Sequence, residues 1–135
     1  MIHGSASHRR LATCHPDLQK LVIAAAEDFD LIVVCGYRDE EEQTIAVRNG
    51  ASKVHYPHSR HNSQPSEAVD LAPWPLDWKD LGRFRQLGAH MEAVASREGI
   101  QVRWGGHWKN YRGDPAPDLP HFELPRLSVK EPDDA

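Results

Sequence analysis

The sequence has few cysteines, no long hydrophobic run and no concentration of basic charge. Cys14 and Cys35 are far apart and form no Cys-x-x-Cys pair, so the spacing typical of zinc fingers and dithiol redox sites is missing. We expect both to be small buried residues. The 16 basic residues are scattered among 20 acidic ones, with a net charge of -4 and a pI near 6.1. This charge pattern argues against a nucleic-acid partner.

The chain also lacks any apolar stretch long enough to span a membrane, so we expect no membrane insertion. Residues 1–5 do not provide the apolar core of a signal peptide. These two absences predict synthesis in the cytoplasm, with any export by another route.

A chain of 135 residues predicts one domain, because a domain of this size buries roughly two-thirds of the surface that its unfolded chain exposes. Residues 1–10 are small, polar and basic, and residues 125–135 are rich in proline and charge. Both ends are expected to be flexible tails. The folded body is therefore predicted over about 11–124.

Apolar periodicity and capping residues predict three helices. Asp39 and Glu42 have the spacing of a capping box, and either Asp77 or Asp80 is placed to cap the longest helix. The predicted helices cover about residues 16–28, 39–49 and 80–99.

Four short strands are predicted between and after these helices, the first being a continuous apolar, β-branched run. The last two are close enough in the chain to lie antiparallel. The expected fold class is therefore α+β, with a small, mainly antiparallel sheet flanked by helices. The long loop 51–66, with three His, two Pro and four Ser, is expected to be functional. The predicted strands are residues 31–35, 68–72, 100–104 and 121–124.

Two histidines and an aspartate form a candidate zinc site. His61, Asp70 and His121 provide three N and O ligands and leave one position of a zinc ion open for chemistry. Asp70 lies within a predicted strand between apolar neighbours, so its side chain points to the opposite face from theirs. A buried carboxylate needs a partner, and a metal is one. Asp118, three residues before His121, is the candidate general base.

The motifs Ser-x-His, Ala-x-Asp, Trp-Gly-Gly and Asp-x-x-His-Phe follow one another in that order over most of the predicted body. Together they resemble the zinc D-alanyl-D-alanine carboxypeptidase and L-alanyl-D-glutamate endopeptidase family, whose fold is shared with the Hedgehog signalling domain. One departure is the spacing from His61 to Asp70, which is nine residues here and usually seven in the family.

The resemblance implies a role for each matching residue. One zinc ion per chain is held by His61, Asp70 and His121, and Asp118 is the catalytic acid/base. The remaining predicted site residues are a catalytic, substrate-binding arginine and three substrate contacts, namely Arg38, Ser59, Trp104 and Gly105. The residues by themselves leave alternatives open: Arg38 as a salt-bridge partner, Ser59 as a loop cap and Trp104 as a core residue.

The function implied is that of a zinc peptidase that hydrolyses peptidoglycan stem peptides, with the L-alanyl-D-glutamate bond as its target. Such a protein is expected to be a monomeric phage or prophage endolysin, made in the host cytoplasm and acting on the cell wall after release. A D-alanyl-D-alanine carboxypeptidase and a non-catalytic zinc-binding module of the same fold are the alternatives. The presence of Asp118 argues against the non-catalytic zinc-binding module, because a protein without catalytic activity does not need a general base.

Overall fold

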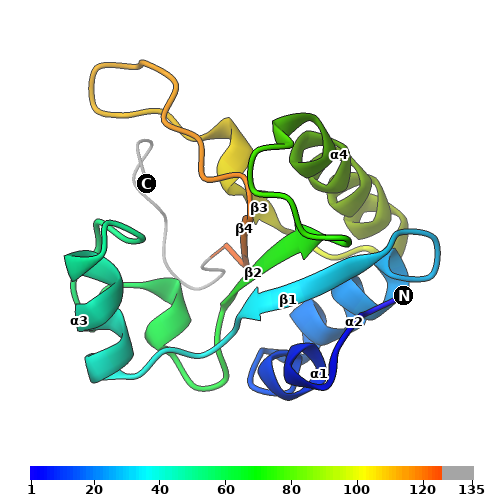
Figure 1. Cartoon of the computed structure of the whole chain (residues 1–135), viewed down its shortest axis with the longest axis horizontal. Coiled ribbons are helices and arrows are strands. Elements are labelled where there is room, and N and C mark those ends of the chain that lie inside the picture. The colour runs from blue at the N-terminus through cyan, green and yellow to red at the C-terminus, as the bar shows by residue number, and fades with distance from the viewer. Residues whose placement is uncertain (126–135) are drawn as a thin grey trace.

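The computed structural model describes residues 1–125, in which helices pack against a four-stranded sheet. Every neighbouring pair of strands is antiparallel, and the strand order is β1-β2-β4-β3 (Figure 1). The α+β class and the antiparallel sheet are thus confirmed. The strands are β1 (Leu31–Cys35), β2 (Ala68–Pro73), β3 (Arg103–Trp104) and β4 (His121–Glu123).

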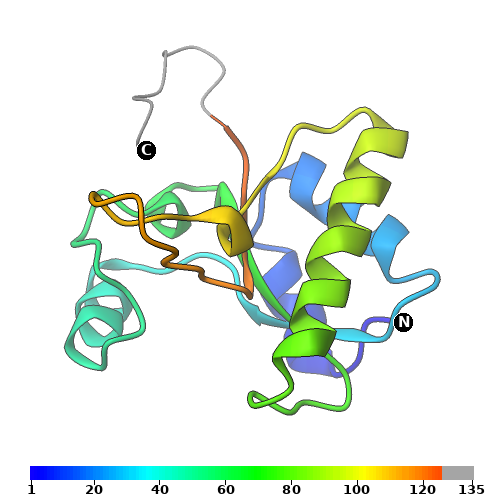
Figure 2. The same ribbon diagram turned by 90° about the horizontal axis from the view of Figure 1, so that it is seen from above.

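Three helices gather at one end of the sheet, while α3 and the short turn η1 lie at the other end (Figures 1 and 2). Within residues 1–125, no helix has both the length and the apolar character required to cross a membrane. The helices are α1 (Ser5–Leu11), α2 (Pro16–Ala25), α3 (Glu40–Arg48) and α4 (Leu81–Glu98), with 3-10 turns η1 (Arg60–Asn62) and η2 (Gly105–His107).

The hydrophobic core lies between one face of the sheet and helices α2 and α4. Val69 and Leu71 alternate with Asp70 along β2, and both are fully buried in this core, together with Phe122 of β4. Leu87 of α4 packs into the same cluster. The period of two along β2 therefore leaves Asp70 on the opposite face of the sheet.

The helix boundaries follow local capping chemistry. Asp39 and Glu42 form the predicted capping box at α3. Asp80, and not Asp77, caps α4 by accepting a hydrogen bond from Arg83 N at 3.2 Å. Gly99 ends α4 in the left-handed conformation, with φ at 69°. Two elements are shorter than predicted, since α2 ends at Ala25 and the third strand is residues 103–104 only.

The N-terminal segment is part of the fold, which corrects the prediction of a flexible tail. Leu31 N donates to Met1 O at 3.0 Å, and His3 N donates to Leu31 O at 2.9 Å. Val33 N donates to Ser7 Oγ at 3.0 Å. These bonds satisfy the outer side of β1, the edge strand, whose backbone groups would otherwise lack partners. Of the predicted C-terminal tail, residues 126–135 lie outside the described residues.

Candidate functional site

The candidate site forms on the sheet face opposite the core, around Asp70 of β2. The pairing of β1 with β2 shifts between Val33 and Cys35, so that Cys35 lies opposite Asp70. On the other side of β2, His121 of β4 is the direct pairing partner of Asp70. Cross-strand partners share a face of the sheet, so the sheet alone brings a thiol and an imidazole beside this carboxylate.

The two predicted histidine ligands converge on one oxygen atom. His61 Nε2 lies 3.3 Å from Asp70 Oδ1, and His121 Nδ1 lies 3.2 Å from the same oxygen. All three side chains are largely removed from solvent. The structure therefore brings together three residues that are separated by up to 60 positions in the sequence.

Backbone contacts fix His61 within η1. Ser59 Oγ accepts a hydrogen bond from His61 N at 3.2 Å, so Ser59 is a cap of this turn. The spacing of nine residues from His61 to Asp70 is accommodated because the loop between them folds back onto the connection between α1 and α2. There Ser66 N donates to Thr13 O at 2.9 Å, and His15 N donates to Ser66 O at 2.8 Å.

Hydrogen bonds behind the two imidazoles define which nitrogen carries the proton. His61 Nδ1 donates to Gly36 O at 2.7 Å, because a carbonyl oxygen only accepts. His61 Nε2 is buried and has no hydrogen-bond partner. His121 Nε2 donates to the Glu123 carboxylate at 2.7 Å. The lone pairs of His61 Nε2 and His121 Nδ1 are both on the side that faces Asp70, as a metal site requires.

The two separations from Asp70 fit a zinc ion. Two ligand atoms that each lie about 2.0–2.1 Å from a tetrahedral zinc are about 3.3 Å apart. The two nitrogen-to-oxygen distances, 3.3 Å and 3.2 Å, agree with that spacing. An orphaned buried nitrogen beside a carboxylate is also an arrangement that a cation satisfies.

Cys35 adds a fourth donor that sequence reasoning took for a buried apolar residue. Ligand atoms of Cys35, His61 and Asp70 all lie within 4.8 Å of one another. Cys35 Sγ is 3.8 Å from His61 Nδ1, the nitrogen that already binds Gly36 O. Cys35, His61 and Asp70 are therefore the donors that lie mutually close within the described residues, whereas His121 approaches this set through its contact with Asp70 Oδ1.

The electrostatics of the site favour positive charge beside Asp70. Burial alone would lower the pKa of His61, but the adjacent Asp70 carboxylate raises it to about 10. Burial alone would raise the pKa of Asp70, yet His121 and His61 hold it far below its usual range. The carboxylate therefore remains ionised and attracts either protonated imidazoles or a metal ion.

Asp118 lies beside the cluster of His61, Asp70 and His121, and its backbone packs closely against Gly105. Asp118 N donates to Gly105 O at 2.8 Å, and a Cβ on Gly105 would overlap the Asp118 carbonyl oxygen. Burial raises the pKa of the Asp118 carboxyl, and the negative charge of Asp70 adds to that effect. A carboxyl group with a raised pKa is suited to accept and return a proton near neutral pH.

Arg38 forms a partly buried ion pair at the site. Its Nη2 donates to Asp70 Oδ2 at 3.3 Å, and its Nη1 donates to Gln43 Oε1 at 3.4 Å. Gln43 is fully buried and donates to Val54 O at 2.6 Å. The salt-bridge alternative for Arg38 therefore describes one of its contacts, and Gln43 fixes the orientation of the guanidinium.

The two tryptophans of the predicted Trp-Gly-Gly segment occupy different surroundings. Trp104 is 8% exposed, packs in the core and donates from Nε1 to Leu119 O at 2.8 Å. Its burial favours a structural role over the predicted substrate contact. Trp108 lies against the site, with its ring centroid 4.8 Å from that of His121.

Comparisons with known proteins agree with this geometry. The sequence model of a family described as phage L-alanyl-D-glutamate peptidase matches residues 2–124. The L-alanyl-D-glutamate peptidase of Escherichia phage T5 is 33% identical over 116 residues, covering 82% of this chain and 83% of that protein. The crystal structure of the Serratia marcescens L-Ala D-Glu endopeptidase ChiX is similar with a TM-score of 0.75 and 29% identity, covering 93% of this chain and 90% of that one.

Proposed function

This chain belongs to the phage L-alanyl-D-glutamate peptidase family, and we propose that it hydrolyses the L-alanyl-D-glutamate bond of peptidoglycan stem peptides with zinc as its cofactor. The observation that carries the proposal is the convergence of His61 Nε2 and His121 Nδ1 on Asp70 Oδ1. These three residues would hold one zinc ion per chain. Bound there, zinc supplies Lewis acidity and lowers the pKa of a bound water to about 7.

The protein's own residues orient the ligands and move the proton. The carbonyl of Gly36 and the carboxylate of Glu123 hold the two imidazoles in the ligating tautomer. Asp118 accepts a proton from the attacking water and then delivers it to the leaving amine. Its raised pKa favours the first of these transfers, since the carboxylate then takes up a proton more readily.

Arg38, Ser59 and Gly105 are the proposed contacts to substrate. Arg38 provides a permanent positive charge that Gln43 and Asp70 orient, and it would bind a substrate carboxylate or the developing oxyanion. Ser59 Oγ accepts from His61 N and keeps its own hydroxyl proton for donation. Gly105 lets the backbone approach closely, because a side chain there would meet Asp118.

We further propose that the protein acts as a monomeric endolysin on the cell wall of a bacterial host. The phage origin of the T5 relative supports this setting. The free stem peptide and the intact wall would then both be substrates, because the scissile bond belongs to the peptide.

Mass spectrometry of digested peptidoglycan tests the proposed bond. The zinc-loaded protein should release stem peptides that begin with D-glutamate and leave L-alanine on the glycan. Loss of only the terminal D-alanine would instead identify a carboxypeptidase. A digest without any new terminus would point to a non-catalytic metal-binding module.

A further inference from the structure

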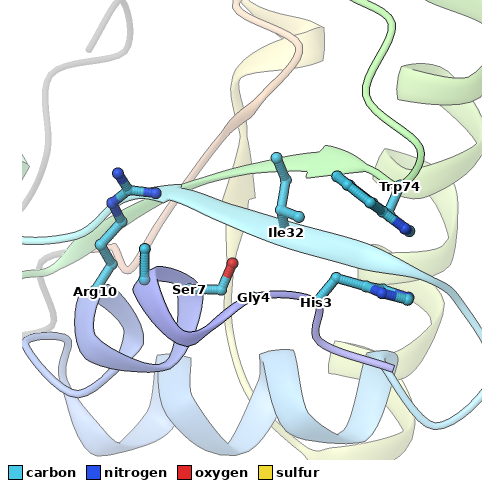
Figure 3. A pocket seen from close by; sticks show the side chains of 7 residues that line it. His3, Gly4, Ser7, Arg10, Ile32 and Trp74 are labelled. Carbon is cyan, nitrogen blue, oxygen red and sulfur yellow. The ribbon is translucent and has the colours of Figure 1, made fainter.

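A pocket of about 340 Å³ lies beside the edge strand, outside the candidate metal site. It is formed by the N-terminal segment, by β1 and by the residue that follows β2, as Figure 3 shows. Its volume is at the lower end of the range typical of small-ligand sites. Its lining includes the side chains of His3, Ser7, Arg10, Ile32 and Trp74.

The pocket is on the same face of the sheet as Asp70. Ile32 pairs with Ala72, which lies two residues after Asp70 in β2, and side chains two apart in a strand share a face. Trp74 is two residues further along. At about 3.3 Å per residue, Trp74 is roughly 13 Å from Asp70 along the chain.

The other end of the pocket lies near Gly36, the residue that follows β1. Arg10 lines the pocket, and its carbonyl oxygen is so close to Gly36 that a Cβ on Gly36 would overlap it. Gly36 is the residue whose own carbonyl binds His61. The pocket therefore begins next to a ligand-orienting residue and extends along β1 toward Trp74.

The chemistry of the lining suits a sugar. Trp74 is 41% exposed and stacks on the ring of His3, with centroids 5.3 Å apart. The C–H face of a pyranose packs well on such an indole because the aromatic face is electron-rich. Arg10 donates from Nη1 to Val33 O at 3.1 Å, which fixes the guanidinium at the wall of the pocket. None of the seven lining residues is acidic, and although His3 Nε2 lies 3.2 Å from Asp30 Oδ1, the remaining N–H groups of Arg10 can donate to hydroxyl and acetamide oxygens.

We infer that this pocket is a subsite for the N-acetylated sugar to which the stem peptide is attached. The inference rests on the proposed function, because L-alanine is joined to the lactyl group of that sugar. One amino acid and one lactyl group span at most about 7 Å, and the ring extends beyond them. A sugar held between Arg10 and Trp74 is thus within reach of a peptide whose scissile bond lies at Asp70.

A two-substrate comparison tests the subsite. We would measure kcat/KM for a disaccharide-linked stem peptide and for the same peptide without sugar. The wild-type protein should favour the sugar-linked substrate at least tenfold, and Trp74→Ala should reduce this ratio at least fivefold. Trp74→Phe should retain most of the ratio because it keeps an aromatic face. Trp78→Ala is the matched control, since Trp78 is 52% exposed and lines no part of this pocket.

A binding measurement separates this inference from the proposed function. The peptide-free disaccharide of N-acetylglucosamine and N-acetylmuramic acid should perturb the NMR signals of Trp74 and Ile32, with at least tenfold weaker binding to Trp74→Ala. If neither peptide is cut, the proposed function fails, while disaccharide binding still supports the subsite. An unchanged substrate ratio in Trp74→Ala, or equal disaccharide binding by both proteins, would overturn the subsite.

Discussion

Each imidazole at the site has its orientation fixed by one acceptor behind it. Gly36 supplies a carbonyl to His61, and Glu123 supplies a carboxylate to His121. Although burial alone would raise it, the pKa of Glu123 is held below its usual value by the hydrogen bond from His121, with Arg60 adding to the effect. The carboxylate therefore stays ionised and accepts the His121 proton. Single residues thus decide which nitrogen is available to a metal.

Asp118→Asn should lower kcat/KM by about 10²–10⁴-fold, because an amide cannot accept the proton of the attacking water. Zinc content should remain near one equivalent, since Asp118 is not a proposed ligand. Peptidoglycan hydrolysis and bound zinc are measured on the same preparation. Asp114→Asn, at an exposed position of the same loop, is the control and should retain wild-type activity. Full activity of Asp118→Asn would remove the assigned base.

Glu123→Ala should weaken zinc binding by about 10–100-fold, because His121 loses the acceptor that fixes its tautomer. Competition with a chromophoric chelator measures this affinity without relying on activity. Glu123→Gln keeps an acceptor oxygen and should bind zinc more tightly than Glu123→Ala. Equal zinc affinities in wild type and Glu123→Ala would show that Glu123 does not position the ligand.

The sequence predicted the site unevenly for physical reasons. His61, Asp70, His121 and Asp118 belong to motifs, so their types and order pointed to a metal site directly. Glu123 was missed, although strand alternation places it on the same face as His121. Two other features of the site cannot be recognised from the local sequence. The proximity of Cys35 to Asp70 depends on the irregular strand pairing after Val33, and Gly36 contacts His61 through its backbone carbonyl.

Among the elements, α4 and β3 pack closely because a glycine faces an indole. A Cβ on Gly88 would overlap the ring of Trp104, which is buried in the core. Gly106 approaches the same ring from the following turn. Gly88 and Gly106 thus make room for a core side chain, in agreement with the alternative that Trp104 is a core residue.

Gly88→Ala should lower the free energy of unfolding by about 1–3 kcal/mol, because the added methyl group overpacks the contact with Trp104. Gly82→Ala, in the same helix, should instead raise it by roughly 0.5–1 kcal/mol, since alanine is the better helix former. There the nearest atom to a new Cβ is Asp80 Oδ1 at 3.6 Å, an ordinary contact. Urea denaturation of both variants measures the difference, and a Gly88→Ala protein as stable as Gly82→Ala would contradict this packing argument.

Elements with strong local signals were predicted well from the sequence. Helices α3 and α4 have side-chain caps, and β1 and β2 are apolar runs with clear ends. α1 was missed because its polar residues bind the edge of β1 instead of forming an amphipathic stripe. Its stability comes from tertiary contacts, which local propensity does not encode.

Across the whole molecule, the proposed ligands connect segments that are far apart in the sequence. His61 lies within η1, Asp70 in β2 and His121 in β4. Bound metal would therefore link these segments in the folded state only. Because such binding stabilises the folded state, the stability of the protein should depend on free zinc.

Removal of metal with a chelator should abolish peptidoglycan hydrolysis and lower the unfolding temperature. Zinc at a hundredfold excess over its Kd should restore about 2.7 kcal/mol of stability, together with activity. Thermal unfolding monitored by circular dichroism, with magnesium as the control ion, measures the effect. Lysis that persists in the presence of a strong chelator, or a Tm that does not respond to zinc, would argue against the proposed cofactor.

Residues 1–10 both cover the edge of β1 and form part of the pocket beside Trp74. Residues 1–10 saturate the outer backbone groups of β1, so a foreign strand can join the sheet there only after that segment has detached. The same ten residues contribute most of the wall around Trp74. Any condition that detaches them would therefore expose the unpaired edge of β1 to aggregation and remove the proposed glycan subsite in a single event.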